Sequence, residues 1–416
     1  MHMRIPAVLM LIFAARAFAE PLDLTAERPF LDAEPQQPRT YTISLADRFS
    51  YDDNLFRIPS ENNVAALVGP GASRQDLVNT VSLGLDGRWY AGSQAISIDL
   101  HVDDNRFVNN DDLNNVSGKA ALVWDWRLGG NLSGQAGANY YRALASFANT
   151  NYYARDMVER EDYFGNARFQ IGPSWTLLAG VDVADTSLSA VSQQLFDFHS
   201  KSGNAGIEYA SPADNTLTLE YRYTDARFPQ VFVLNGAPFN SDYNEDTARV
   251  SIKYAFTAVT LLEASAGYLK RDYPYSSFAA FSGAIGRASL QWQPAYKLQF
   301  VLTGWRELKA YVDSESDYFV STGASIAPQW TLTEQVSMSL GTSWEKHDYI
   351  GSSPSALTLL SRHDKLISEQ ARVAYKPIPT LAVELTYRFD RRDSNRAEFN
   401  FDDMLAAVGV TYKFGR

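Results

Sequence analysis

Apolar and polar side chains alternate one residue at a time along most of this chain. Residues 217–223 read Leu-Thr-Leu-Glu-Tyr-Arg-Tyr, so leucine and tyrosine occupy one side of an extended chain and threonine, glutamate and arginine the other. Residues 116–127 and 381–390 divide in the same way. A period of two is typical of a β-strand whose two faces meet different surroundings. The pattern therefore predicts an all-β protein.

Turns that contain proline separate these strands. Gly172-Pro173-Ser174 precedes the strand that begins at Trp175, and related turns are expected at 211–214, 294–296, 328–330 and 377–379. Proline lacks an N–H group and fixes φ, so it ends a ladder and favours a tight turn. Hairpins that follow one another without intervening helices form an up-and-down meander. A meander of this length should close into a barrel, because an open sheet would leave long exposed edges.

We expect about eighteen strands, with sixteen as the nearest alternative. The expected strands span residues 40–52, 76–90, 94–107, 114–128, 131–145, 159–171, 175–188, 200–210, 215–227, 243–256, 259–272, 282–293, 297–312, 317–327, 331–347, 365–376, 380–392 and 401–414. Short connections alternate with long polar ones, such as 146–158, 189–199, 228–242 and 348–364. Short turns at one end and long loops at the other are typical of a transmembrane β-barrel in the bacterial outer membrane.

The N-terminus indicates export from the cytoplasm. Arg4 is followed by an apolar run and by Ala17-Phe18-Ala19, which has the pattern of a signal-peptide cleavage site. We expect a signal peptide at 1–19, a proline-rich periplasmic segment at 20–39 and an outer-membrane barrel at 40–416. The chain has no cysteine, which excludes disulfides and thiolate metal sites. Its net charge of −11 argues against nucleic acid as a partner.

The two faces of the strands assign the inside and the outside of the barrel. A charge that faces lipid at mid-depth costs several kcal/mol, so the charged face should line the lumen and the apolar face should contact lipid. The residues expected to line the lumen, as contacts for a polymer or as determinants of selectivity, are Asp86, Arg88, Asp99, His101, Asp125, Arg127, Arg168, Asp182, Glu220, Arg222, Arg249, Glu263, Arg287, Arg372, Glu384 and Arg388. Both signs of charge are present, so neighbouring strands should pair acid with base.

Other candidate sites are weaker. Trp305 and Phe164 could stack on sugar rings within the lumen, although most aromatic residues should face lipid. The Asp-Asn clusters at 103–105, 109–112 and 402–403 lack the ligand spacing of a calcium loop, so we interpret them as solvated acids. His347-Asp348 is the only hint of a hydrolase site, and the chain lacks nucleophile-elbow, zinc-protease and phosphate-loop motifs. We therefore expect neither catalysis, a metal nor a cofactor.

One segment carries a more specific resemblance. Residues 44–57, and Tyr51-Asp52-Asp53-Asn54-Leu55-Phe56-Arg57 in particular, resemble the opening strand of EpsL-type outer-membrane proteins, which belong to the β-barrel porins encoded with exopolysaccharide and exosortase systems. The resemblance implies a pore that exports a newly made polysaccharide and works with an inner-membrane synthase and periplasmic export components.

Three functions remain open at this point. The first is export of an exopolysaccharide, with connections 53–75, 228–242 and 348–364 folding inward as a gate. The second is a diffusion porin for small solutes, either general or substrate-specific. The third is a surface-binding or structural barrel with a plugged lumen.

Overall fold

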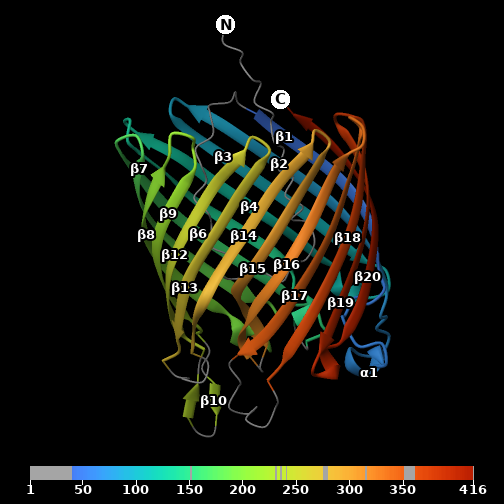
Figure 1. Ribbon diagram of the computed structural model, residues 1–416. Coiled ribbons are helices and arrows are strands. Elements are labelled where there is room, and N and C mark those ends of the chain that lie inside the picture. Colours follow the sequence, from blue (N-terminus) through green and yellow to red (C-terminus); the bar gives the residue numbers. More distant parts are fainter. Residues whose placement is uncertain are drawn as a thin grey trace.

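The chain folds into a closed antiparallel β-barrel (Figure 1). The computed structural model describes residues 40–149, 152–229, 232–234, 237–239, 241–274, 280–313, 316–350 and 361–415. The expected signal peptide and periplasmic segment at 1–39 lie outside the described residues. Eighteen strands form one sheet, which confirms the predicted fold class and the preferred strand number.

The barrel strands follow the sequence almost without interruption. Their bounds are β1 Thr40–Asp52, β2 Asp76–Ala91, β3 Gln94–Phe107, β4 Asn115–Leu128, β5 Leu132–Leu144, β6 Met157–Ile171, β7 Trp175–Leu188, β8 Phe198–Ala210, β9 Thr216–Arg227, β12 Tyr243–Thr257, β13 Thr260–Asp272, β14 Phe281–Ala295, β15 Leu298–Asp313, β16 Ser316–Thr331, β17 Val336–Ile350, β18 His363–Ile378, β19 Leu381–Ser394 and β20 Phe401–Gly415. A separate hairpin, β10 (Phe232–Leu234) and β11 (Ala237–Phe239), interrupts the series between β9 and β12.

Closure comes from pairing of the first and last strands. β1 pairs with β2 along one edge and with β20 along the other, in a register that runs from Thr42–Gly415 to Asp52–Leu405. No sheet edge is therefore left for a second chain to extend. Each remaining barrel strand pairs with its neighbours in sequence, apart from the step from β9 to β12.

The two ends of the barrel differ, as the connection lengths predict. Both termini of the barrel lie at the end with the short turns, and β10 and α1 (Val64–Leu67) lie at the other end (Figure 1). Three of the short turns place a glycine at a positive φ near +64°, at Gly92, Gly129 and Gly172, where a Cβ would be strained. Among the described residues, four short 3-10 helices belong to the longer connections: η1 Asp111–Leu113, η2 Phe147–Asn149, η3 Gln194–Phe196 and η6 Ala397–Phe399.

The turn predicted at 328–330 is wrong, and those predicted at 294–296 and 377–379 lie slightly later, at 296–297 and 379–380. β16 continues through Pro328 to Thr331, and residues 332–335 form the turn that had been expected at 328–330. Pro328 remains paired with Phe300 of β15, whereas the ladder to β17 passes directly from Ile326–Thr342 to Gln329–Ser339. A proline removes a single N–H group, so it interrupts a ladder on one side only. β17 consequently starts at Val336 rather than at 331.

The outer surface of the wall is apolar. Large exposed side chains recur at every second residue, for example Leu83 at 56 %, Val102 at 53 % and Leu385 at 56 % of their accessible surface. Within the described residues, no helix has both the length and the apolar character to cross a membrane. Alternate apolar residues facing outward around a closed sheet are the arrangement of a membrane-spanning barrel.

Candidate functional site: the lumen and its constriction

The charged residues that were expected to line the lumen lie on the strand face opposite the exposed apolar side chains. On β9, Leu219 and Tyr221 are exposed at 54 % and 51 %, while Glu220 and Arg222 alternate with them and point the other way. The same alternation places the other fourteen residues: Asp86, Arg88, Asp99, His101, Asp125, Arg127, Arg168, Asp182, Arg249, Glu263, Arg287, Arg372, Glu384 and Arg388.

Ion pairs that skip a strand show that this charged face is the concave one. Arg168 of β6 reaches Glu208 of β8 at 2.5 Å, and Arg222 of β9 reaches Asp182 of β7 at 2.6 Å. Strands separated by one other strand lie about 10 Å apart, and side chains converge across that gap only on the inside of a curved wall. Arg88 of β2 and Asp125 of β4 form a third such pair, at 2.9 Å.

Several other inward charges are paired with an opposite charge on a neighbouring strand. These pairs are Lys119–Asp99 at 2.7 Å, Arg287–Glu307 at 2.7 Å and Arg372–Glu384, and His101 also lies 3.1 Å from Asp99 on its own strand, β3. Arg249 lies opposite Glu220 in the β9–β12 register, and Glu263 lies opposite Lys253. Arg127 and Glu263 are exposed. The result is a polar, hydrated lining in which both signs of charge are available to a passing solute.

At the loop-bearing end, one connection folds across the lumen. η2 belongs to the β5–β6 connection, yet Cα atoms of η2 and β15 lie within 8 Å of each other. Six strands of the wall separate β6 from β15 along the shorter way round. The Arg392 guanidinium of β19 also donates a hydrogen bond to the carbonyl oxygen of Ala148 in η2. Contacts with two such distant parts of the wall place η2 inside the barrel.

The end of the β15–β16 hairpin also bends into the barrel. Tyr318, Phe319, Val320 and Ser321 are all buried, with at most 2 % of their surface exposed. A strand within the wall exposes every second residue to lipid, so four consecutive buried residues mean that both faces are covered. Phe319 stacks on His347 of β17, with ring centroids 4.1 Å apart, while its neighbours face the opposite cluster. We therefore place this end of the hairpin inside the barrel.

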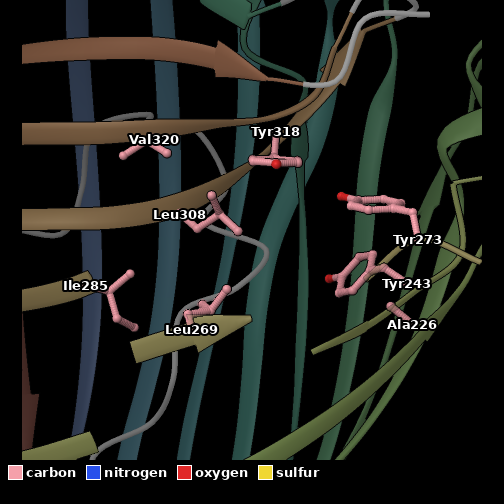
Figure 2. Packing of buried hydrophobic residues seen from close by; sticks show 8 residues of the cluster. All are labelled: Ala226, Tyr243, Leu269, Tyr273, Ile285, Leu308, Tyr318 and Val320. Atoms are coloured by element: carbon pink, nitrogen blue, oxygen red, sulfur yellow. The ribbon is translucent and has the colours of Figure 1, made fainter. Parts of the chain in front are cut away.

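Figure 2 shows the buried cluster against which Tyr318 and Val320 pack. The wall contributes Tyr243 from β12, Leu269 from β13, Tyr273 just after β13 and Ile285 from β14. Arg271 lies over the Tyr243 ring at 4.0 Å and over the Tyr318 ring at 5.5 Å, and pairs with Glu245 at 2.6 Å. A buried guanidinium that is both paired and stacked joins the hairpin end to the wall.

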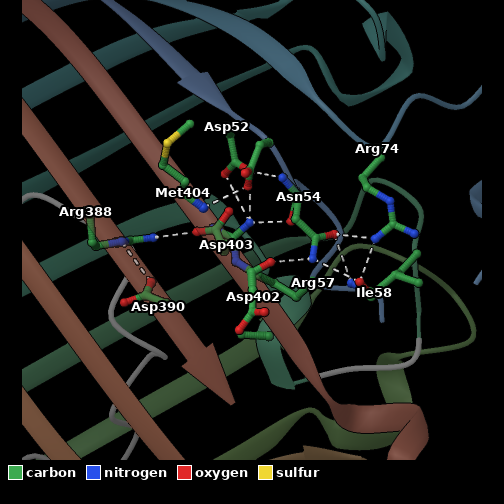
Figure 3. A network of polar contacts seen from close by, with 12 residues as sticks. Asp52, Asn54, Arg57, Ile58, Arg74, Arg388, Asp390, Asp402, Asp403 and Met404 are labelled. Carbon is green, nitrogen blue, oxygen red and sulfur yellow. Dashed lines mark hydrogen bonds and ion pairs between the residues drawn. The ribbon is translucent and has the colours of Figure 1, made fainter. Parts of the chain in front are cut away.

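A second network anchors the β1–β2 connection (Figure 3). Arg57 pairs with Asp52 at 3.1 Å and with Asp403 of β20 at 2.9 Å, and it adopts a positive φ of 55°. The Asn54 side chain donates to the carbonyl oxygens of Ile58 and Asp402, at 2.9 and 2.8 Å. The Asp-Asp-Asn-Leu-Phe-Arg motif thus has a structural role here: it folds the connection back onto the barrel seam.

The same motif also contacts η2. Phe56 is 1 % exposed and packs against Phe147 of η2, with ring centroids 5.0 Å apart. We call the constriction the group formed by η2, the connection 53–75 and the end of the β15–β16 hairpin. Of the three connections expected to fold inward, 53–75 packs against η2, whereas the described β10–β11 hairpin of 228–242 extends away from the barrel (Figure 1). Residues 230–231, 235–236, 240 and 351–360 of the other two lie outside the described residues. No sequence pattern indicates that η2 or the hairpin end is buried, because their residues do not differ in pattern from the strands around them.

Trp305 lies on the inner face of the wall, whereas His347 and Asp348 lie on opposite faces. The Trp305 Nε1 donates to Ser321 Oγ at 2.9 Å, and Arg287 lies 5.5 Å from the Trp305 ring. His347 binds Glu345 at 2.6 Å on the inner face, whereas Asp348 binds Lys346 and His363 on the outer face. Adjacent strand residues point to opposite faces, so His347 and Asp348 do not form a catalytic pair.

Comparison with known proteins finds the same architecture in porins. Residues 233–414 match the model of a family described as "Putative beta-barrel porin 2". The structure is similar to that of Pseudomonas aeruginosa OccK2 (OpdF), both alone and in complex with glucuronate, with a TM-score of 0.50 and 11 % sequence identity over 90 % of this chain and 98 % of that one. Identity at this level supports the fold alone. No curated protein matches the sequence.

These findings define the class of the protein. The closed eighteen-strand wall, its apolar outer face and its charged lumen are those of a porin-like barrel. The family match over the C-terminal part of the chain agrees with this class. The protein is a porin-like β-barrel of the outer membrane.

Proposed function

We propose that this barrel is a passive channel for small polar solutes. The observation that carries the proposal is the constriction, in which η2 spans the lumen to contact β15 and β19. Such an element allows passage of single small molecules, but obstructs a growing polymer chain. The paired charges of the wall below it would hydrogen-bond hydroxyl and carboxylate groups without holding them strongly.

The solutes that fit best are neutral or singly charged, such as sugars and sugar acids. OccK2, which shares the fold, has been solved with glucuronate. In this chain the inward pairs, such as Arg222–Asp182, offer a donor and an acceptor side by side, which suits a molecule that has both hydroxyl and carboxylate groups. A strongly anionic polymer would instead favour an unbroken basic track.

Export of an exopolysaccharide is the alternative, and it rests on the resemblance of residues 44–57. In this structure, the end of that segment holds the β1–β2 connection against β20 through the Arg57–Asp403 ion pair. Its residues therefore have a structural role that is independent of any polymer. The constriction therefore favours the small-solute channel over the export pore.

Permeation measured against solute size tests the proposal. The barrel is reconstituted into liposomes, and the swelling rate is followed with a monosaccharide, a disaccharide and longer oligosaccharides at equal osmolarity. We expect the rate to fall steeply between the disaccharide and the longer oligomers. Equal rates for all of them would contradict a narrow channel, and the absence of swelling with any solute would favour a plugged, structural barrel.

A deletion strain distinguishes the export alternative. If the barrel exports polymer, loss of the gene should remove polysaccharide from the cell surface and trap it in the periplasm. We expect unchanged surface polymer and slower uptake of small solutes. Accumulation in the periplasm that the intact gene relieves would instead establish export.

A further inference from the structure

A cavity of about 380 Å³ opens at the loop-bearing end of the barrel, away from the lumen. Eight residues line it, three of them arginines: Arg106, Arg142, Arg155, Asn114, Asn115, Val116, Met157 and Ser189. This volume is within the range of small-molecule sites. Arg106 is at the end of β3, Arg142 is on β5, and Arg155 is in the β5–β6 connection just before β6.

The cavity lies on the outer, lipid-facing side of the wall. Arg106 alternates in phase with Val102, which is 53 % exposed, and Val116 is itself 47 % exposed. Arg142 lies opposite Gly118 in the β4–β5 register, and Gly118 shares the face of Val116. Long loops mark the extracellular end of such barrels, so the cavity is at the level of the outer-leaflet headgroups.

Each guanidinium group is held in place by one partner but keeps N–H donors that these contacts do not use. Arg106 pairs with Asp104 through Nε and Nη2 at 3.0 and 2.8 Å, and Arg142 pairs with Glu159 at 2.9 Å. Arg155 Nη1 donates to the carbonyl oxygen of Asn114 at 3.1 Å. Three arginines against two carboxylates leave one positive charge. Each guanidinium has five N–H donors, so each keeps donors beyond these contacts.

We propose that this cavity binds a phosphate group of an outer-leaflet lipid headgroup. Arginine matches phosphate oxygens with paired N–H donors, and three arginines around one space form a site for a tetrahedral anion. The exposed Val116 and the glycine next along its face, Gly118, continue from the cavity toward the apolar band. A lipid can therefore place its phosphate among the arginines and its acyl chain along this surface, which a free anion cannot do. The site is independent of what passes through the lumen.

Lipid retention by the purified barrel tests the site. Native mass spectrometry would count bound molecules of a bisphosphorylated diglucosamine lipid, added in detergent to the wild type and to the triple variant Arg106→Gln, Arg142→Gln and Arg155→Gln. We expect the apparent affinity of the triple variant to fall about tenfold or more, because glutamine cannot make charge-assisted hydrogen bonds to phosphate oxygens. The Arg391→Gln variant is the matched control, since Arg391 is also an outward arginine paired with an aspartate, at 3.1 Å, but lies on β19.

Two further arms identify the ligand. The same lipid without its phosphates should bind the wild type as weakly as the phosphorylated lipid binds the triple variant. Inorganic phosphate should compete only at concentrations far above that of the lipid. Equal retention of both lipids, equal loss in Arg391→Gln, or displacement by phosphate at lipid concentrations would each overturn the proposal. Heat-dependent gel migration confirms that every variant is folded.

Discussion

The wall of the barrel and its constriction use the same residue types in opposite ways. In the wall, arginine and acid pairs such as Arg222–Asp182 remain partly exposed to the lumen, with side-chain exposures of 17 % and 29 %. In the constriction and around it, comparable groups are buried: Arg271 is 2 % exposed and Asp364 is 0 % exposed. The wall depends on backbone ladders that need no particular side chain. The constriction depends on specific side chains, and single substitutions should separate the two.

The largest effect is expected for Tyr318→Ala. Tyr318 is fully buried between the Tyr273 ring and Arg271, so its removal should leave a cavity and free the hairpin end, at a cost of about 3–5 kcal/mol. Hydrogen exchange should then increase at 316–321, while the rest of the barrel stays protected. Tyr296→Ala is the control, because Tyr296 is 88 % exposed in a short turn. Equal exchange in both variants would show that the hairpin end is not packed.

A smaller loss of stability is expected when a charged pair of the wall is removed. Asp182→Asn removes an inward carboxylate and Arg222→Gln removes its partner, and the pair should contribute no more than about 1 kcal/mol to stability. Ion selectivity should respond more than stability does. Reversal potentials in a salt gradient should shift toward anions for Asp182→Asn and toward cations for Arg222→Gln. Shifts in the same direction would contradict the placement of the pair in the conducting lumen.

The smallest expected effect is that of pH on the stability of the β5–β6 connection. Asp156, which ends the β5–β6 connection, accepts hydrogen bonds from Ala190 N at 2.8 Å and Ser189 Oγ at 3.2 Å, and its burial raises the pKa of its carboxyl group above the ordinary 3.8. The folded connection therefore holds a proton that the unfolded one releases, so its stability falls as pH rises from about 4 through the raised pKa.

Hydrogen exchange at residues 152–157, measured from about pH 4 to 7, should become faster than the chemical rate alone predicts. Asp156→Asn keeps the Oδ1 acceptor and removes the charge, so its exchange should lose this additional pH dependence. An Asp156→Asn profile identical to that of the wild type would contradict a role for this carboxyl group.

The comparison also explains what could be predicted from the sequence. Alternation predicted the eighteen strands, because a strand with lipid on one side and water on the other has a different residue type at every second position. The turn was predicted too early, at Pro328, because a proline interrupts the ladder on one side of its strand and leaves the ladder on the other side intact. η2 and the hairpin end were missed because their burial depends on contacts between residues far apart, such as Arg392 with Ala148, that leave no local pattern.

Single-channel conductance of Arg392→Ala beside Arg391→Ala tests the central claim most directly. The two arginines are neighbours on β19, but Arg392 points inward to η2, whereas Arg391 points outward and pairs with Asp393. If η2 narrows the lumen, Arg392→Ala should raise the conductance, or produce frequent larger openings, while Arg391→Ala should conduct like the wild type. Unchanged conductance in both variants would contradict a constriction that η2 forms and Arg392 holds in place.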